Sequence, residues 1–139
     1  MTAFNKFQQF VEDLAKGVHN LATGALTLAL CATANAPVAT NSVLANLTQV
    51  SYTNLSTRLC TTTSCVQTTG TLKLLIVDQV LTASGTVAAF QYVVLYNDTP
   101  TSPADPLIGW YDYGSALTLS TGETFTVDFD GSAGVLTIA

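Results

Sequence analysis

The residues of this sequence that could do chemistry are one histidine, nine acidic residues and three cysteines. Nucleophilic catalysis needs a base beside the nucleophile, but His19 follows a helical pattern, so we interpret it as a surface or helix-end residue. A pair of carboxylates could cleave a glycosidic bond, yet the candidates lie in or near predicted turns, where aspartate is common for structural reasons. The candidates are Asp98, Asp105, Asp112, Asp128 and Asp130. The sequence therefore predicts no catalytic residue and a protein that is not an enzyme.

Metal ligands are also too few at the required spacings. The stretch Asp128–Gly131 begins like a calcium loop but lacks the third oxygen ligand and the distal glutamate. A single histidine and the absence of a CxxC pair leave a tetrahedral zinc site short of ligands. Cys60 and Cys65 could close a small disulfide loop in an oxidising compartment, although free thiols are our default prediction. We predict no metal and no cofactor.

The composition indicates a single domain of 139 residues whose surface is covered by partners. Hydrophobic residues make up 48% of the chain and charged residues only 9%, against about 25% charged in typical soluble domains. Monomers rarely expose large apolar patches, so we expect an oligomer or an obligate partner. Four basic against nine acidic residues argue against nucleic acid. No apolar run approaches the ~20 residues of a spanning helix, so we expect no membrane partner.

The most informative stretch is Ala88–Gly114, which holds Trp110 and most of the tyrosines. Phe90–Tyr96 and Leu107–Tyr113 are dense in β-branched and aromatic residues, so they predict two strands. The connection between them contains three prolines and predicts a long loop. An aromatic platform for a sugar is an alternative use of these rings, but alternation along a strand sends neighbouring rings to opposite faces, where most of them pack in the core.

The first 21 residues predict an amphipathic helix. Their apolar residues recur at helical spacing, Glu12 and Lys16 form a favourable pair four residues apart, and Gly17 is a plausible terminator. This segment is either a lid on the fold or an arm that docks onto a neighbouring subunit. The apolar residues of the pattern are Phe4, Phe7, Phe10, Val11, Leu14, Val18 and Leu21.

Residues 24–139 predict a β-rich body. Ala25–Cys31 is interpreted as a core strand rather than as part of a secretory segment, because acidic residues and a helical pattern precede it. The polar stretch Thr53–Gly70, which contains the sole arginine, predicts a long exposed loop or loose hairpin. Further elements are a helical turn in Thr40–Leu47 and strands in Gln49–Tyr52, Thr71–Thr82, Ala116–Leu119, Glu123–Phe129 and Val135–Ile138.

These elements predict a mainly β fold, an antiparallel β-sandwich or barrel-like domain with one N-terminal amphipathic helix. Thr71–Thr82 and Phe90–Tyr96 are apolar on both faces, so both faces of these strands need a cover. In a sandwich we expect the second face to be covered by the helix or by another subunit.

Several segments together resemble a group of small structural proteins of tailed bacteriophage virions. The most specific are YVVLYND and LIGWYDYG, whereas Asn54–Thr69 departs from the group because Cys60 and Cys65 stand in place of a glycine-rich stretch. The resemblance implies a capsid decoration, or cement, protein on the outer capsid surface, made in the host cytoplasm. The remaining matching segments are FNKFQQFVEDLAKGVHNL, NAPVATNSVLANLTQV and GETFTVDFDGSAGVLTIA.

The partners expected on this basis are the major capsid protein and further copies of the chain, as a dimer or trimer. The alternative is a tail, baseplate or fibre component whose aromatic residues contact host glycan. In either case we expect the amphipathic segment and the proline loop to supply contacts. The candidate interface residues are Phe4, Phe7, Phe10, Val11, Leu14, Pro103 and Trp110.

Overall fold

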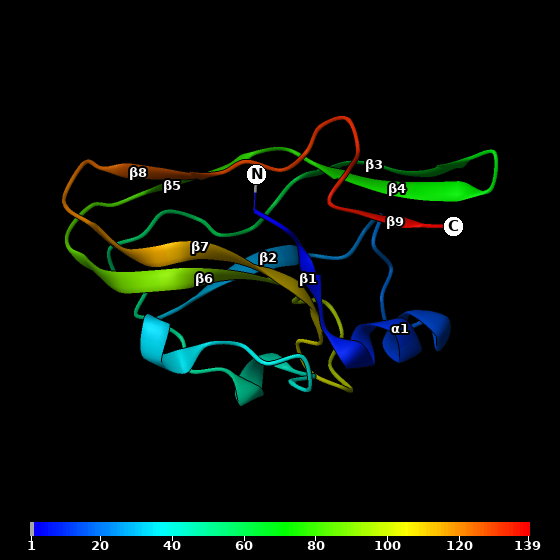
Figure 1. Ribbon diagram of the computed structural model, residues 1–139, viewed down its shortest axis with the longest axis horizontal. Helices are drawn as coiled ribbons and strands as arrows, with labels where there is room; N and C mark the ends of the chain where they lie inside the picture. Colours follow the sequence, from blue (N-terminus) through cyan, green and yellow to red (C-terminus); the bar gives the residue numbers. More distant parts are fainter. Residues whose placement is uncertain (1) are drawn as a thin grey trace.

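The computed structural model describes residues 2–139 and has two layers of antiparallel strands with one short helix at the side (Figure 1). The lower layer is a four-stranded sheet in the order β1 (Asn5–Lys6), β7 (Leu107–Leu119), β6 (Val87–Asn97), β2 (Leu26–Cys31). The upper layer holds the three-stranded sheet β3 (Thr62–Thr68), β4 (Thr71–Ile76), β9 (Leu136–Ile138) and the pair β5 (Gln79–Thr82), β8 (Thr124–Val127). The predicted β-sandwich-like class is confirmed.

The centre of the fold is the predicted strand pair around the proline loop. β6 and β7 pair antiparallel, with Val94 opposite Trp110 and Leu95 opposite Gly109. The prediction of a separate short strand after Gly114 is wrong, because β7 continues through that glycine to Leu119. Gly114 has φ +91°, a conformation that glycine adopts without a steric penalty, so the backbone passes through this position without ending the strand.

The four-stranded sheet is buried on both faces, as the two-sided apolar pattern of β6 predicted. Val93 and Leu95 join the main core between the layers, whereas Val94 and Tyr96 join a second cluster on the opposite face. That second face is covered by Phe7 and by the segment that carries the short 3-10 helices η1 (Thr33–Asn35) and η2 (Leu44–Asn46). The cover is therefore supplied by the chain itself, mainly by irregular structure and not by the helix.

The N-terminal helix is much shorter than predicted. α1 spans Gln8–Ala15, and Phe7 before it has an extended backbone (φ −73°, ψ 147°). Asn5–Lys6 forms β1 and pairs with Trp110 and Gly109 of β7. Phe4 and Phe7, at the start of the helical pattern, thus flank a strand and are not helical, because pairing with an open sheet edge satisfies backbone groups that a first helical turn would leave free. The predicted terminator Gly17 follows the helix with φ +77°.

The polar stretch Thr53–Gly70 is partly a strand, so its description as a long loop is wrong and the hairpin alternative is closer. β3 and β4 form an antiparallel hairpin that turns at Thr69 and Gly70. Both turn residues have positive φ (51° and 88°), as a tight hairpin turn requires. Its threonines and valine have high β propensity, which the absence of large apolar residues concealed.

Three other predicted elements have a clear outcome. The helical turn in Thr40–Leu47 is present as η2. Gln49–Tyr52 forms no strand, although Val50 N–H donates to Leu30 of β2 at 2.9 Å. Thr71–Thr82 divides after Ile76 into β4 and β5, which lie in different sheets.

Candidate interaction surfaces

The sole histidine was predicted as a surface or helix-end residue; it lies just beyond the end of α1 but is buried, so the surface alternative is wrong. His19 is 6% exposed, its ring lies 5.2 Å from that of Phe10, and its Nδ1 lies 3.4 Å from the Asn97 side-chain nitrogen. Asp13, 4% exposed, is buried nearby on α1. Within residues 2–139, His19 Nε2 and Asp13 Oδ2 have no hydrogen-bond partner. The histidine is thus a buried polar residue that anchors the end of the helical segment to β6.

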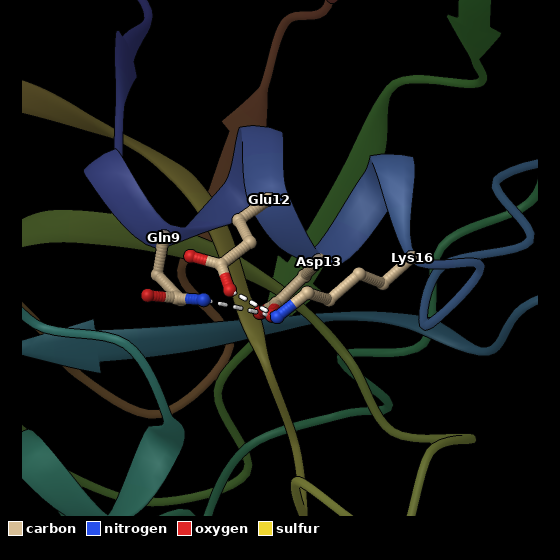
Figure 2. A network of polar contacts seen from close by, with 4 residues as sticks. All are labelled: Gln9, Glu12, Asp13 and Lys16. Carbon is tan, nitrogen blue, oxygen red and sulfur yellow. Dashed lines mark hydrogen bonds and ion pairs between the residues drawn. The ribbon is translucent and has the colours of Figure 1, made fainter.

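α1 carries a small polar network that extends from surface residues to the buried Asp13 (Figure 2). Gln9 Nε2 donates to Asp13 Oδ1 at 3.1 Å, and Lys16 forms the predicted ion pair with Glu12. The hydrogen bond and charge of Lys16 lower the pKa of Glu12, and the same contact raises the pKa of Lys16. Both groups are at the surface, where water screens such pairs, so the network orients Asp13 more than it stabilises the fold.

The stability of the protein is expected to fall as the pH drops below about 6.5. Burial lowers the pKa of His19 from its ordinary value of 6.5, and the negative charge of Asp13 only partly opposes this. Because the unfolded chain then binds the proton more readily, acid favours unfolding below the ordinary value. The measurement is urea denaturation from pH 5 to pH 8 for the wild type and for His19→Gln. The slope between pH 6.5 and pH 5 should be shallower in the variant, and an equal slope in both proteins contradicts this role for His19.

The remaining acidic residues and thiols are dispersed. Among residues 2–139, no group of three or more histidine, cysteine, aspartate or glutamate side chains is arranged to hold a metal ion. All three cysteines are free, as predicted by default. Burial raises the pKa of Cys31 to about 11 and that of Cys60 to about 12, so both thiols stay protonated and poorly nucleophilic at neutral pH.

The seven candidate interface residues do not share one environment. Phe7 and Phe10 are 0% and 3% exposed within a single chain, so as folded they are unavailable to a second one. Phe4, Leu14 and Trp110 are half-buried, and Trp110 stacks on Phe7 with ring centroids 4.5 Å apart. Only Val11, on α1, and Pro103, in the loop between β6 and β7, are exposed. The helical spacing identified apolar positions. It could not distinguish residues that pack on the protein's own sheet from residues that stay exposed.

The exposed side of the helix borders a groove. This α1–β9 groove, of about 470 Å³, lies between α1 and the edge strand β9. Val11 is 50% exposed and Ile138 is 38% exposed at its rim. The lining is mostly apolar and includes Phe4, Phe10, Val11, Leu14, Leu136 and Ile138. It is the most extended apolar hollow that the predicted residues help to form.

A second surface was missed by the sequence analysis. The outer face of the β3–β4 hairpin is a shallow groove of about 560 Å³ lined by Ser64, Val66, Thr68, Thr71, Lys73 and Leu75. These residues alternate along the two strands, as expected for one face of a hairpin. The alternation of Ser64, Val66 and Thr68 could have indicated a strand with one exposed face, but the polar composition of the stretch obscured this pattern.

Comparisons of the chain with protein-family models, with curated proteins and with solved structures found no match. Along residues 2–139, none of the helices has the length and hydropathy needed to cross a membrane.

Proposed function

We propose that this chain is a non-enzymatic structural protein of a tailed-phage virion, and specifically a capsid decoration protein. It is made in the host cytoplasm and binds on the outer capsid surface, where it bridges neighbouring major capsid proteins. The resemblance of the YVVLYND and LIGWYDYG segments to such virion proteins supports this proposal. These segments form the ends of β6 and β7 that flank the proline loop.

The observation that carries the proposal is the exposure of large apolar side chains on a chain with few charges. Several lie on different sides of the body, which suits a protein that contacts more than one neighbour. Val11 at the α1–β9 groove and Pro103 in the proline loop are the exposed members of the predicted interface. The large apolar residues that remain exposed are Val11, Val38, Leu59, Val66, Val77, Val80, Tyr113 and Ile138.

The mechanism is mass action on the assembled lattice. A protein that binds the expanded capsid better than its free subunits stabilises the capsid by that difference in affinity. The α1–β9 groove would accept an apolar segment of the major capsid protein. Because the groove is lined mostly by apolar atoms, binding would be driven by burial of this surface and would depend little on salt.

The copy number and the groove can be tested on particles. We expect hundreds of copies per particle, in a fixed ratio to capsid subunits, and capsids that lose their DNA at lower temperature when the protein is absent.

Val11→Asp should lower binding to undecorated capsids by about tenfold or more, because it places a charge in an apolar contact. The matched control is Val38→Asp, since Val38 is similarly exposed (53%) but does not line the groove.

Two outcomes contradict the proposal. A few copies per particle would exclude a decoration role. Equal binding of both variants to capsids, with unchanged thermal unfolding of each, would exclude the α1–β9 groove as the contact surface.

The second candidate is a tail, baseplate or fibre component that contacts host glycan. A small apolar hollow of about 190 Å³ supports it, because Tyr111, Tyr113 and Phe125 line it. Tyr113 is 51% exposed and lies 5.5 Å from Phe125 between ring centroids, so an aromatic face is accessible to a sugar. This role predicts few copies per particle and binding of the isolated protein to host polysaccharide. Adsorption should then be lost in Tyr113→Ala while folding is retained, whereas Trp110, which the sequence suggested for this role, packs on Phe7 and does not line the hollow.

A further inference from the structure

β3 is a seven-residue strand with one free edge. It pairs only with β4 in its sheet, and no other backbone hydrogen bond reaches Ser64–Thr68 from elsewhere in residues 2–139. The edges of β2 and β5 are covered by other segments, whereas the other terminal strands β8 (four residues) and β9 (three residues) are shorter than β3. Leu28 N–H donates to Arg58 at 3.0 Å along β2, and Ser56 N–H donates to Thr82 at 3.0 Å along β5.

The hairpin geometry identifies which backbone groups are free. A tight two-residue turn is closed by a hydrogen-bonded pair, here Thr68 and Thr71, and such pairs alternate with non-hydrogen-bonded pairs along the ladder. Val66 with Lys73 is therefore a hydrogen-bonded pair, whereas Cys65 and Gln67 direct their N–H and C=O groups away from β4. The free edge thus presents the backbone groups of Cys65 and Gln67 on either side of Val66.

Between Ser64 and Thr68 this edge lacks the features that normally prevent pairing between proteins, because the one irregularity in the β3–β4 register lies before it, between Thr62 and Ser64. Native edge strands are protected by charged residues, proline or a covering segment. Thr62–Thr68 contains neither a charged residue nor a proline. Val66, at the centre of Ser64–Thr68, is 60% exposed, the largest exposed fraction among the large apolar side chains of the described chain.

We propose that β3 pairs antiparallel with β3 of a second copy of this chain across a two-fold axis at Val66. In this register Cys65 lies opposite Gln67 of the partner, and the free backbone groups of the two copies form hydrogen bonds with each other. The two Val66 side chains form the central non-hydrogen-bonded pair, with Cβ atoms about 4.5–5.5 Å apart. The two hairpins then form one continuous sheet.

A second copy fits this edge better than a different partner for two reasons. An antiparallel strand is self-complementary about a two-fold axis, so both copies use the same residues. The chain carries a net charge of −5, which makes copies repel at most surfaces, but the β3 edge has no charge of its own. The outer face beside it carries Lys73 and no acidic residue.

The size of the contact sets the expected strength. A single pair of short strands buries less surface than a standard interface, so the dimer should be concentration-dependent in solution. On a particle, a second binding site for each copy raises the local concentration and strengthens the same contact. The proposal does not rest on the virion role, because it concerns the purified chain.

Disulfide trapping tests the register directly. Val66→Cys in a Cys65→Ser background should give a covalent dimer under mild oxidation, because facing residues of an antiparallel non-hydrogen-bonded pair lie within disulfide distance. The control is Val80→Cys in the same background, since Val80 is also exposed (47%) but lies on β5. Failure of the Val66→Cys protein to crosslink, or equal crosslinking of both variants, overturns the proposal.

Sedimentation of uncrosslinked protein gives an independent test. The wild type should move from monomer to dimer with rising concentration, and Val66→Glu should weaken association by about tenfold or more because it places like charges opposite each other. The introduced carboxylate would also lie beside Lys73 within its own hairpin, so the hairpin should be retained. Val80→Glu has the same net charge and should dimerise like the wild type. A wild type that is monomeric throughout the series, that forms trimers, or whose dimer survives Val66→Glu overturns the proposal.

Discussion

Replacing Phe7 by alanine is expected to lower the free energy of unfolding by about 3–5 kcal/mol. Phe7 is fully buried and stacks on Trp110 at 4.5 Å between ring centroids. Its backbone also ties the segment to the sheet, because Phe7 N–H donates to Ile108 at 3.2 Å. Truncation leaves a cavity in the cluster on the outer face of the four-stranded sheet, and the irregular segment over it can collapse only in part. Urea denaturation followed by tryptophan fluorescence measures the loss.

Val11→Ala is the matched control for Phe7→Ala. Val11 belongs to the same predicted apolar pattern but is 50% exposed, so its truncation should change stability by no more than about 0.5 kcal/mol. Similar small effects from both variants would mean that residues 2–7 are not part of the folded body, which would restore the alternative of an arm that docks on a neighbour.

Replacing Arg58 by alanine is expected to cost about 2–3 kcal/mol of stability, from a charged hydrogen bond and a cation–π contact. Arg58 Nη1 donates to the Leu28 carbonyl, and its Cζ lies 3.6 Å from the centre of the Tyr52 ring. Tyr52 Oη in turn accepts from Leu30 N–H at 2.9 Å. The arginine thus holds residues 50–60 against the edge of β2. Thermal and urea denaturation measure the effect.

Lys73→Ala is the control for the change in charge. Lys73 is exposed and donates to the Ser132 carbonyl at 3.1 Å, so its removal should have an effect below about 1 kcal/mol. Arg58→Lys should lie between the wild type and Arg58→Ala, because lysine keeps the charge but not the planar group that stacks on Tyr52. An Arg58→Ala protein as stable as the Lys73→Ala protein would show that the side chain contributes nothing to covering this edge.

The β6–β7 pair could be predicted from sequence patterns, whereas the contacts of Arg58 could not. The β6–β7 pair was predictable because aromatic and β-branched residues cluster on each side of a proline-rich loop, and these are local signals. The role of Arg58 was not predictable. It depends on contacts with Leu28 and Tyr52, and no spacing in the Thr53–Gly70 stretch indicates these contacts. The polar composition predicted only a long exposed loop or a loose hairpin.

The N-terminal segment shows the same limit in a different form. The helical spacing of Phe10, Val11 and Leu14 corresponds to the helix Gln8–Ala15. Asn5–Lys6 before it instead pairs with the open edge of β7 as a strand. Gly109 makes that approach possible, since a Cβ there would meet the Asn5 carbonyl oxygen at 2.6 Å. His19 was predicted at the surface for a related reason: its burial against Asn97 depends on a contact 78 residues away in the chain.

The sequence by itself determined the β-rich class, the central strand pair and the scarcity of charge, because composition, turn residues and two-residue alternation are local properties. Only the tertiary structure decided which apolar residues are buried, which strand edges are covered and which stay open. Those outcomes depend on which distant segments lie beside one another, and a periodicity measured along one segment carries no information about its neighbours in space.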